Sequence, residues 1–365
     1  MPESPLCAAA RARGAACIEV DGWTVPAAFA DSAAEYRTLR EDAALVDLAY
    51  RARIRVTGSD RVDFLHGMLS NDVKGLGPGR GCPALLLTEQ GKVVADCIVL
   101  ALADAILLDG MASATAAASA ALERHVVADD VELTTLGTAD HAFGVYGPAA
   151  ARVLERLGVA TAPAEDYAHA IAEVQGVAMR IARVPGLGAG GFLCLVPSDK
   201  AAAWWARCVK AGLPPAGQQA LEVLRIESGA PAYGRDFGPD TIALEASLDA
   251  AISFTKGCYL GQEVIERVTA RGHVNRKLVG LEVSGAAVPP IGAALFAGDR
   301  EVGWVTSAAW SWRLACPVAL GYARCEHLTP GTILDVRVGT GATPATVRAL
   351  PLIQKGATPH GDSTR

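Results

Sequence analysis

The hydrophobic pattern of this chain changes near Leu278, and this change constrains the fold more than any other feature. From there to Ala349, short apolar runs alternate with glycine and proline. Runs too short for helices and separated by turn residues are typical of a small β-barrel or sandwich. We therefore expect a C-terminal β-barrel domain over residues 276–352, followed by a disordered polar tail at 353–365.

The part before the barrel predicts an α+β core over residues 20–275, built from discontinuous subdomains. Within it, residues 50–150 predict strands and helices in the order strand, helix, two strands, helix, two strands. This order suggests a ferredoxin-like unit. Residues 32–46 are predicted to form one helix, with Asp31 or Ser32 as its N-cap.

Composition and charge exclude several classes of protein. The formal net charge of −6 does not favour a direct nucleic-acid partner. The nine cysteines include no C-x-x-C pair, which argues for a reducing compartment and against a metal site. We find no signal peptide, and the longest apolar stretch is too short to span a bilayer. We expect a soluble, cytoplasmic protein with no membrane partner.

Residues 256–263, Lys-Gly-Cys-Tyr-Leu-Gly-Gln-Glu, hold the densest mixture of chemical groups in the chain. A buried strand does not tolerate so many polar groups, and a solvated loop does not need them. The glycines suggest tight backbone geometry or close approach of a ligand. Cys258 follows Lys256 closely, and a nearby cation can stabilise a thiolate and make it reactive.

The signature, together with an ordered set of weaker motifs, resembles the folate-dependent aminomethyltransferase superfamily, whose founding member is the glycine cleavage T-protein. The signature itself is similar to that of the YgfZ branch, folate-binding proteins implicated in iron–sulfur cluster maturation. The similarity extends from about residue 22 to residue 347. The weaker motifs are Gly22-Trp23, Gly58-Ser59-Asp60-Arg61, Asn71-Asp72-Val73, Gly91 with Asp96, Gly147-Pro148, Leu224-Arg225-Ile226-Glu227, Arg271-Gly272 and Ala319-Leu320-Gly321-Tyr322.

The resemblance implies a three-part ring around a central folate channel, with tetrahydrofolate or a one-carbon derivative as cofactor. It assigns catalytic roles to Cys258 and Asp96. The expected folate contacts are Lys256, Tyr259, Gln262, Arg225, Arg271 and Asn71.

Each of these assignments has a structural alternative. Cys258 is otherwise a small apolar filler, Lys256 and Arg271 are solvated charges, and Asp96 caps a turn. The remaining alternatives are that Gln262 starts a helix and that Arg225 and Glu227 form a buried ion pair between domains.

The chain departs from the aminomethyltransferase pattern at four positions. Adjacent aspartates become Ala95-Asp96, a pterin-reading glutamate becomes Ala189, a pocket tyrosine becomes Pro83, and a signature aspartate becomes Cys258. A carboxylate can read the donor edge of a pterin through two hydrogen bonds. These departures argue against aminomethyl transfer unless another acid substitutes.

The function expected from the resemblance is therefore a folate-binding accessory role in iron–sulfur cluster assembly or repair, supporting tRNA-modifying iron–sulfur enzymes. Its expected partners are folate and iron–sulfur proteins or their assembly factors. One cysteine cannot hold a stable cluster alone, so we expect none bound. The alternatives are a tetrahydrofolate-dependent aminomethyltransferase or demethylase, and a scaffold without catalytic activity.

Overall fold

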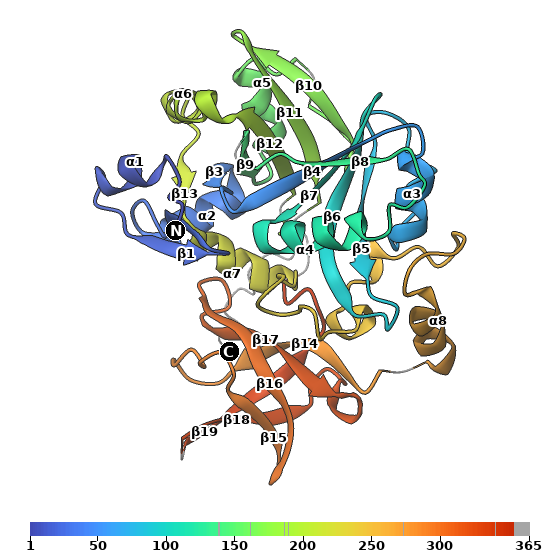
Figure 1. The fold of residues 1–365 in the computed structure, drawn as a ribbon. Coiled ribbons are helices and arrows are strands. Elements are labelled where there is room, and N and C mark those ends of the chain that lie inside the picture. Colours follow the sequence, from blue (N-terminus) through green and yellow to red (C-terminus); the bar gives the residue numbers. More distant parts are fainter. Residues whose placement is uncertain are drawn as a thin grey trace.

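The structure, a computed structural model, describes residues 1–353 except 138, 161, 186, 189, 273 and 340, and omits the side chain of Arg271. Two large sheets and a closed barrel surround the centre of the molecule, with helix α7 (Gln218–Ser228) between them (Figure 1). The tail prediction falls almost wholly on residues 354–365, outside the described part. No helix in the described part is long and apolar enough to cross a membrane.

The first sheet has the strand order β5-β6-β7-β4-β8. In β4, Ile54 and Val56 are buried on the side covered by helix α4, whereas Arg51 and Arg53 project from the opposite face. The elements are β4 (Arg51–Thr57), α3 (Arg61–Met68), β5 (Gly81–Leu87), β6 (Val93–Ala101), β7 (Ile106–Met111), α4 (Ala112–Glu123) and β8 (Glu132–Thr135).

The second sheet has the order β10-β11-β12-β9-β3-β13. Strand β9 is the last strand of the ferredoxin-like unit predicted over residues 50–150. It pairs with β12 and β3 in this second sheet and not with the other strands of that unit. Its strands and helices are β3 (Ala44–Asp47), β9 (Asp140–Tyr146), α5 (Ala150–Arg156), β10 (His169–Val174), β11 (Val177–Val184), β12 (Gly191–Pro197), α6 (Ser198–Lys210) and β13 (Pro215–Ala216).

The helix predicted over 32–46 ends early. Helix α2 covers Ser32–Glu41, with the Asp31 side chain accepting a hydrogen bond from the Ala33 N–H as predicted for the cap. The residues after it form β3, whose four residues are all buried between β9 and β13. Strand pairing with distant segments therefore overrides the local helical pattern. The other N-terminal elements are α1 (Cys7–Arg11) and the antiparallel strands β1 (Cys17–Val20) and β2 (Trp23–Pro26), which form the N-terminal hairpin.

The C-terminal strands close into a barrel in the order β14-β17-β16-β15-β18-β19, and β19 pairs back to β14. Leu281, Val305, Ala319 and Val347 fill its interior. The expected α+β fold with a C-terminal β-barrel is thus confirmed. The elements are α8 (Gln262–Arg271), β14 (Arg276–Val283), β15 (Ala294–Ala297), β16 (Arg300–Ser311), β17 (Cys316–Arg324), β18 (Ile333–Val338) and β19 (Gly341–Arg348).

Helix α7 (Gln218–Ser228) joins the sheets to the barrel. It ends at Gly229, which has a φ of +70°. A side chain there would lie 2.8 Å from Cβ of Leu350, so glycine is required both by the conformation and by the close approach of the C-terminal segment.

Candidate functional site

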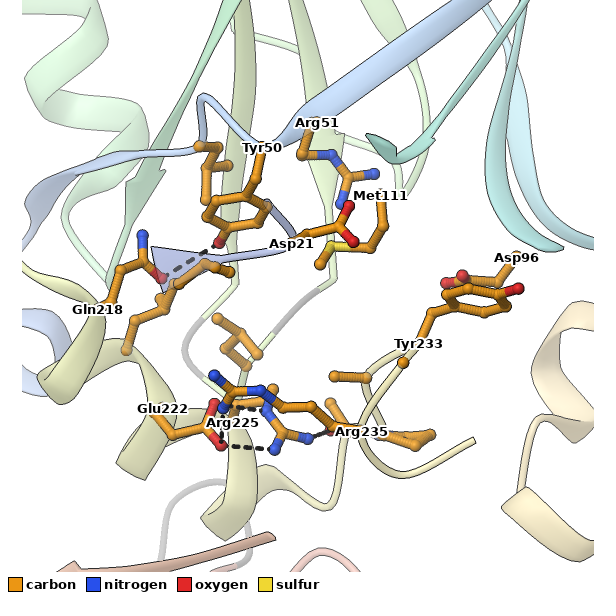
Figure 2. Close-up of a pocket in the computed structure, with 18 of the residues that line it drawn as sticks. Asp21, Tyr50, Arg51, Asp96, Met111, Gln218, Glu222, Arg225, Tyr233 and Arg235 are labelled. Carbon is orange, nitrogen blue, oxygen red and sulfur yellow. Dashed lines mark hydrogen bonds and ion pairs between the residues drawn. The ribbon is translucent and has the colours of Figure 1, made fainter. Parts of the chain in front are cut away.

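A cavity of about 1200 Å³ lies where the N-terminal hairpin, the first sheet, α7 and the barrel meet. Figure 2 shows side chains that line it, among them Arg51 and Asp96 from the first sheet and Glu222 and Arg225 from α7. Its size exceeds that of an ordinary ligand site of about 300–1,000 Å³. Side chains from distant segments line it, namely Asp21, Tyr50, Arg51, Pro83, Asp96, Met111, Tyr146, Gln218, Glu222, Arg225, Tyr233, Arg235, Trp310 and Trp312.

Asp96 is in strand β6 and lines this cavity. Its Oδ1 is shielded from solvent and accepts no hydrogen bond from the described residues. Burial raises the pKa of this carboxyl, and the nearby Arg51 only partly opposes the rise. The sequence places Asp96 at a turn, but the structure shows it inside a strand, so the turn-cap alternative does not describe it.

Arg51 faces the cavity from β4, two strands away from Asp96. Its Nε donates to Asp109 Oδ2 at 2.7 Å, and its Nη2 donates to the same carboxylate. Asp109 Oδ1 lies 3.5 Å from Nη1 of the fully buried Arg53. The sequence analysis did not identify Arg51 as a site residue. The alternation of residues along β4 places Arg51 and Arg53 on the same face of the strand, and this pattern was the available signal.

Arg225, predicted to contact folate, also lines the cavity, yet its donors are engaged within the protein. Nε and Nη2 donate to Glu222 at 2.8 and 2.7 Å, Nη1 donates to Asp236 at 2.6 Å, and Nη2 also donates to Ser307 in the barrel at 2.7 Å. The ion pair suggested between Arg225 and Glu227 is absent from these contacts. Glu227 instead accepts from Tyr36, Arg40 and Ser311.

Glu222 also pairs with Arg235, at 2.9 Å, on the cavity wall. Burial acts to raise the pKa of Glu222, but the hydrogen bonds and charges of Arg225 and Arg235 outweigh it and the pKa is lowered. Glu222 is therefore an ionised carboxylate held between two guanidiniums.

The signature residues lie away from the cavity, on the segment that leads into α8 (Figure 1). Cys258 is exposed. The Nζ of Lys256 donates to the carbonyl of His66 in the last turn of α3 and to those of Leu69 and Asn71 just past its end. Tyr259 is buried in the core beside Lys256. Lys256 is thus a half-buried cap of α3.

The remaining predicted folate contacts are also outside the cavity lining. Gln262 accepts a hydrogen bond from the Tyr259 N–H at 3.2 Å and begins α8, so it both orients the signature loop and starts the helix. Asn71 donates to the Pro83 carbonyl at 2.8 Å, and Pro83 does line the cavity. Arg271 ends α8 with its side chain undescribed, and Ala189 lies outside the described residues.

Comparisons with known proteins agree along the whole chain. Residues 6–256 match the GCVT N-terminal domain family, and residues 276–354 match the glycine cleavage T-protein C-terminal barrel domain family. The aminomethyltransferase of Saccharopolyspora erythraea is 31% identical, over 97% of this chain and 99% of the relative. That of Geobacillus kaustophilus is 30% identical over the same shares.

A solved structure agrees with these relatives. The crystal structure of glycine cleavage system aminomethyltransferase T from Bartonella henselae superposes with a TM-score of 0.90 at 25% identity, covering 97% of this chain and 98% of that chain.

These findings contradict the expected role in iron–sulfur cluster assembly. The similar proteins are named aminomethyltransferase, which corresponds to the alternative function and not to a YgfZ-type accessory role. The expectation rested on the signature around Cys258, and Cys258 itself is exposed and outside the cavity lining. On the match of both domain families and of relatives along nearly its full length, this chain belongs to the glycine cleavage T-protein superfamily.

Proposed function

We propose that this protein is a tetrahydrofolate-dependent aminomethyltransferase. The observation that carries the proposal is the Asp96 carboxyl, which lines a large cavity with an oxygen that no described residue satisfies. A buried polar group without a partner is costly to the fold, and such a cost is typical of functional positions. The names of the similar proteins support the same reaction class.

The cavity fits a folate in size and in chemistry. Tyr50, Tyr146 and Tyr233 supply flat aromatic surfaces suited to a pterin ring, and Gln218 supplies an amide. Although position 189 carries no acid, the carboxylates of Asp21 and Glu222 also line the wall. Acidic groups are therefore present despite the departures seen in the sequence.

The position of Asp96 suits proton exchange with a reacting amine. Tetrahydrofolate, when bound, supplies two nitrogens that accept a one-carbon unit at the oxidation level of formaldehyde. Burial raises the pKa of the Asp96 carboxyl, and in its protonated form this carboxyl is suited to donate a proton to the departing amine nitrogen.

The test replaces Asp96 by asparagine, which keeps the shape and removes the acid. We expect calorimetry under anaerobic conditions to show tetrahydrofolate binding by both proteins. Tetrahydrofolate-dependent release of ammonia from an aminomethyl donor should fall by roughly 10²- to 10⁴-fold in the variant.

Asp104→Asn is the matched control, because Asp104 is 73% exposed in the turn between β6 and β7 and pairs only with Arg55 among the described residues. Failure of the wild-type protein to bind tetrahydrofolate, or full turnover by Asp96→Asn, would refute the proposal.

A further inference from the structure

Two cysteines lie close together in the N-terminal part of the chain. Cys7 begins α1, which packs against both strands of the N-terminal hairpin, and Cys17 begins β1 of that hairpin (Figure 1). Cys7 is fully buried, Cys17 is partly exposed, and both are free thiols. Such a pair joins a thiol that an oxidant can reach to a thiol that is shielded from it.

The register of the hairpin decides which way Cys17 points. Strands β1 and β2 pair so that Cys17 lies opposite Pro26 and Glu19 lies opposite Thr24. Side chains alternate along each strand, so these four residues share one face. The other face packs into a hydrophobic core through Ile18, Val20, Trp23 and Val25. Cys17 therefore projects away from that core.

Two hydrogen bonds bring Cys7 to the same region. Its Sγ donates to the Thr24 carbonyl at 3.3 Å, and Thr24 is the diagonal neighbour of Cys17 across the strands. One helical turn after Cys7, the Ala10 carbonyl accepts from the Ala15 N–H at 3.0 Å, so the chain folds back onto α1 just before Cys17. Burial first, and the neighbouring Cys17 thiol second, raise the pKa of Cys7 to about 12, which agrees with this placement.

We infer that Cys7 and Cys17 are a site of reversible oxidation, at which a hydroperoxide joins the two thiols in a disulfide between α1 and the N-terminal hairpin. The site lies outside the proposed reaction and does not depend on it. In a reducing compartment the resting form is the pair of free thiols, as the structure has it.

The chemistry has two balanced steps. Cys17, the accessible thiol, loses its proton to solvent, and its sulfur attacks one oxygen of the peroxide. The O–O bond breaks, the second oxygen leaves as water, and Cys17 becomes a sulfenic acid. The Cys7 sulfur then attacks the Cys17 sulfur, and the hydroxyl leaves as water with the Cys7 proton. Two thiols and one peroxide thus give one disulfide and two waters.

The disulfide would restrain a part of the cavity wall. The hairpin forms its own two-stranded sheet, and a two-stranded hairpin is marginally stable by itself. Its residues Ile18, Val20 and Asp21 line the cavity. Because the disulfide closes a short loop between α1 and β1, it restricts the opening of this hairpin.

The first measurement maps the oxidised sites in the full-length protein. The native protein is treated with limiting hydrogen peroxide, remaining thiols are alkylated, and peptides are identified by mass spectrometry. We expect a linked Cys7–Cys17 peptide pair that dithiothreitol separates. If Cys7 and Cys17 are both alkylated while the exposed Cys258 and Cys325 are oxidised, the inference is wrong.

Variants test the order of the two steps. In Cys7→Ala, Cys17 has no resolving thiol, so we expect dimedone to trap its sulfenic acid, whereas the wild type should label at least about tenfold less. Equal labelling of the two proteins would overturn the assigned role of Cys7. Circular dichroism checks folding. If Cys7→Ala does not fold, Cys17→Ser still tests the pair, because it removes only a partly exposed thiol and should form no linked peptide.

Hydrogen exchange measures the effect on the hairpin. We expect peroxide to slow amide exchange over residues 18–23 by at least about tenfold in the wild type. The same slowing should occur in the control Cys325→Ser, which lacks an exposed thiol of the barrel domain, and should be absent in Cys17→Ser. A disulfide that leaves exchange in the hairpin unchanged would overturn the inferred restraint.

Discussion

At the scale of single residues, Asp96 combines function with a cost to stability. Its carboxyl is buried, one oxygen has no hydrogen-bond partner among the described residues, and burial raises its pKa. The charged groups around it are Arg51 from β4 and Asp109 from β7, with the Tyr233 hydroxyl nearby. An acid whose folded-state pKa is raised contributes stability that is complete below its ordinary pKa, 3.8 here, and is lost as the pH rises through the folded-state pKa.

We therefore expect Asp96→Asn to melt at a higher temperature than wild type at neutral pH, because the variant cannot ionise. Each kcal/mol gained corresponds to roughly 2–4 °C. The difference should shrink as the pH falls toward the ordinary pKa of an aspartate. Thermal melts of both proteins from pH 4 to 8 measure this difference in melting temperature. If Asp96→Asn were less stable than wild type at pH 7, the raised pKa of Asp96 would be contradicted.

The same carboxyl predicts the pH dependence of turnover. If the protonated form donates to the amine, kcat/KM falls as the pH rises through the raised pKa of Asp96. We expect this alkaline limb in wild type and in Asp104→Asn, and its absence in Asp96→Asn. A limb that persists in Asp96→Asn would assign it to another group.

At the scale of secondary-structure elements, the signature segment fastens one part of the molecule to another. Lys256 caps the end of α3 through three carbonyls, and Gly261 lets α8 start against the β5–β6 turn. Gly261 has a φ of +84°, and a Cβ there would lie 2.5 Å from the Thr88 carbonyl oxygen. These contacts explain why Lys256 and Gly261 occur in the signature, and the explanation requires no bound ligand.

We expect Lys256→Met to destabilise the protein by about 1–3 kcal/mol, because it leaves half-buried carbonyls without a charged donor. Tetrahydrofolate affinity should stay unchanged, since Lys256 does not line the cavity. Urea unfolding and calorimetry test both points. Lys92→Met is the control, because its ion pair with Asp240 is exposed and contributes about 1 kcal/mol or less. A loss of folate affinity with unchanged stability would restore the ligand role predicted for Lys256.

At the scale of the whole molecule, α7 holds the barrel against the sheets and forms part of the cavity wall. Arg225 reaches Asp236 and Ser307, and Glu227 reaches Tyr36 on one side and Ser311 on the other. Asp236 also accepts from the Thr306 hydroxyl. A buried polar network therefore joins α2, α7 and the barrel beside the cavity. The cavity wall depends on contacts between these parts and is not built by one domain alone.

We expect Arg225→Met to cost about 3–5 kcal/mol, because it leaves the buried Asp236 without its cation. Arg235→Met is the matched control. It shares Glu222 with Arg225 but is 38% exposed, so its loss should cost about 1 kcal/mol or less. Denaturant unfolding compares them, and equal losses would show that the network does not hold the barrel.

The sequence by itself determined the features that depend on local pattern. Apolar runs between glycines and prolines define the strands of the barrel, and the resemblance to a known family marked Asp96 as a candidate acid. The barrel prediction succeeds because strand alternation and turn chemistry are set by neighbours along the chain.

Only the tertiary structure decided which chemical groups meet. Residues 42–46 belong to a strand region and not to a helix, because β9 and β13 lie beside them. Lys256 donates to the end of α3 and lies outside the cavity lining. Arg51 and Asp96 both line the cavity, because the sheet joins strands that are far apart in the sequence. Burial, strand order and the cavity are properties of those long-range pairings, and local sequence carries no record of them.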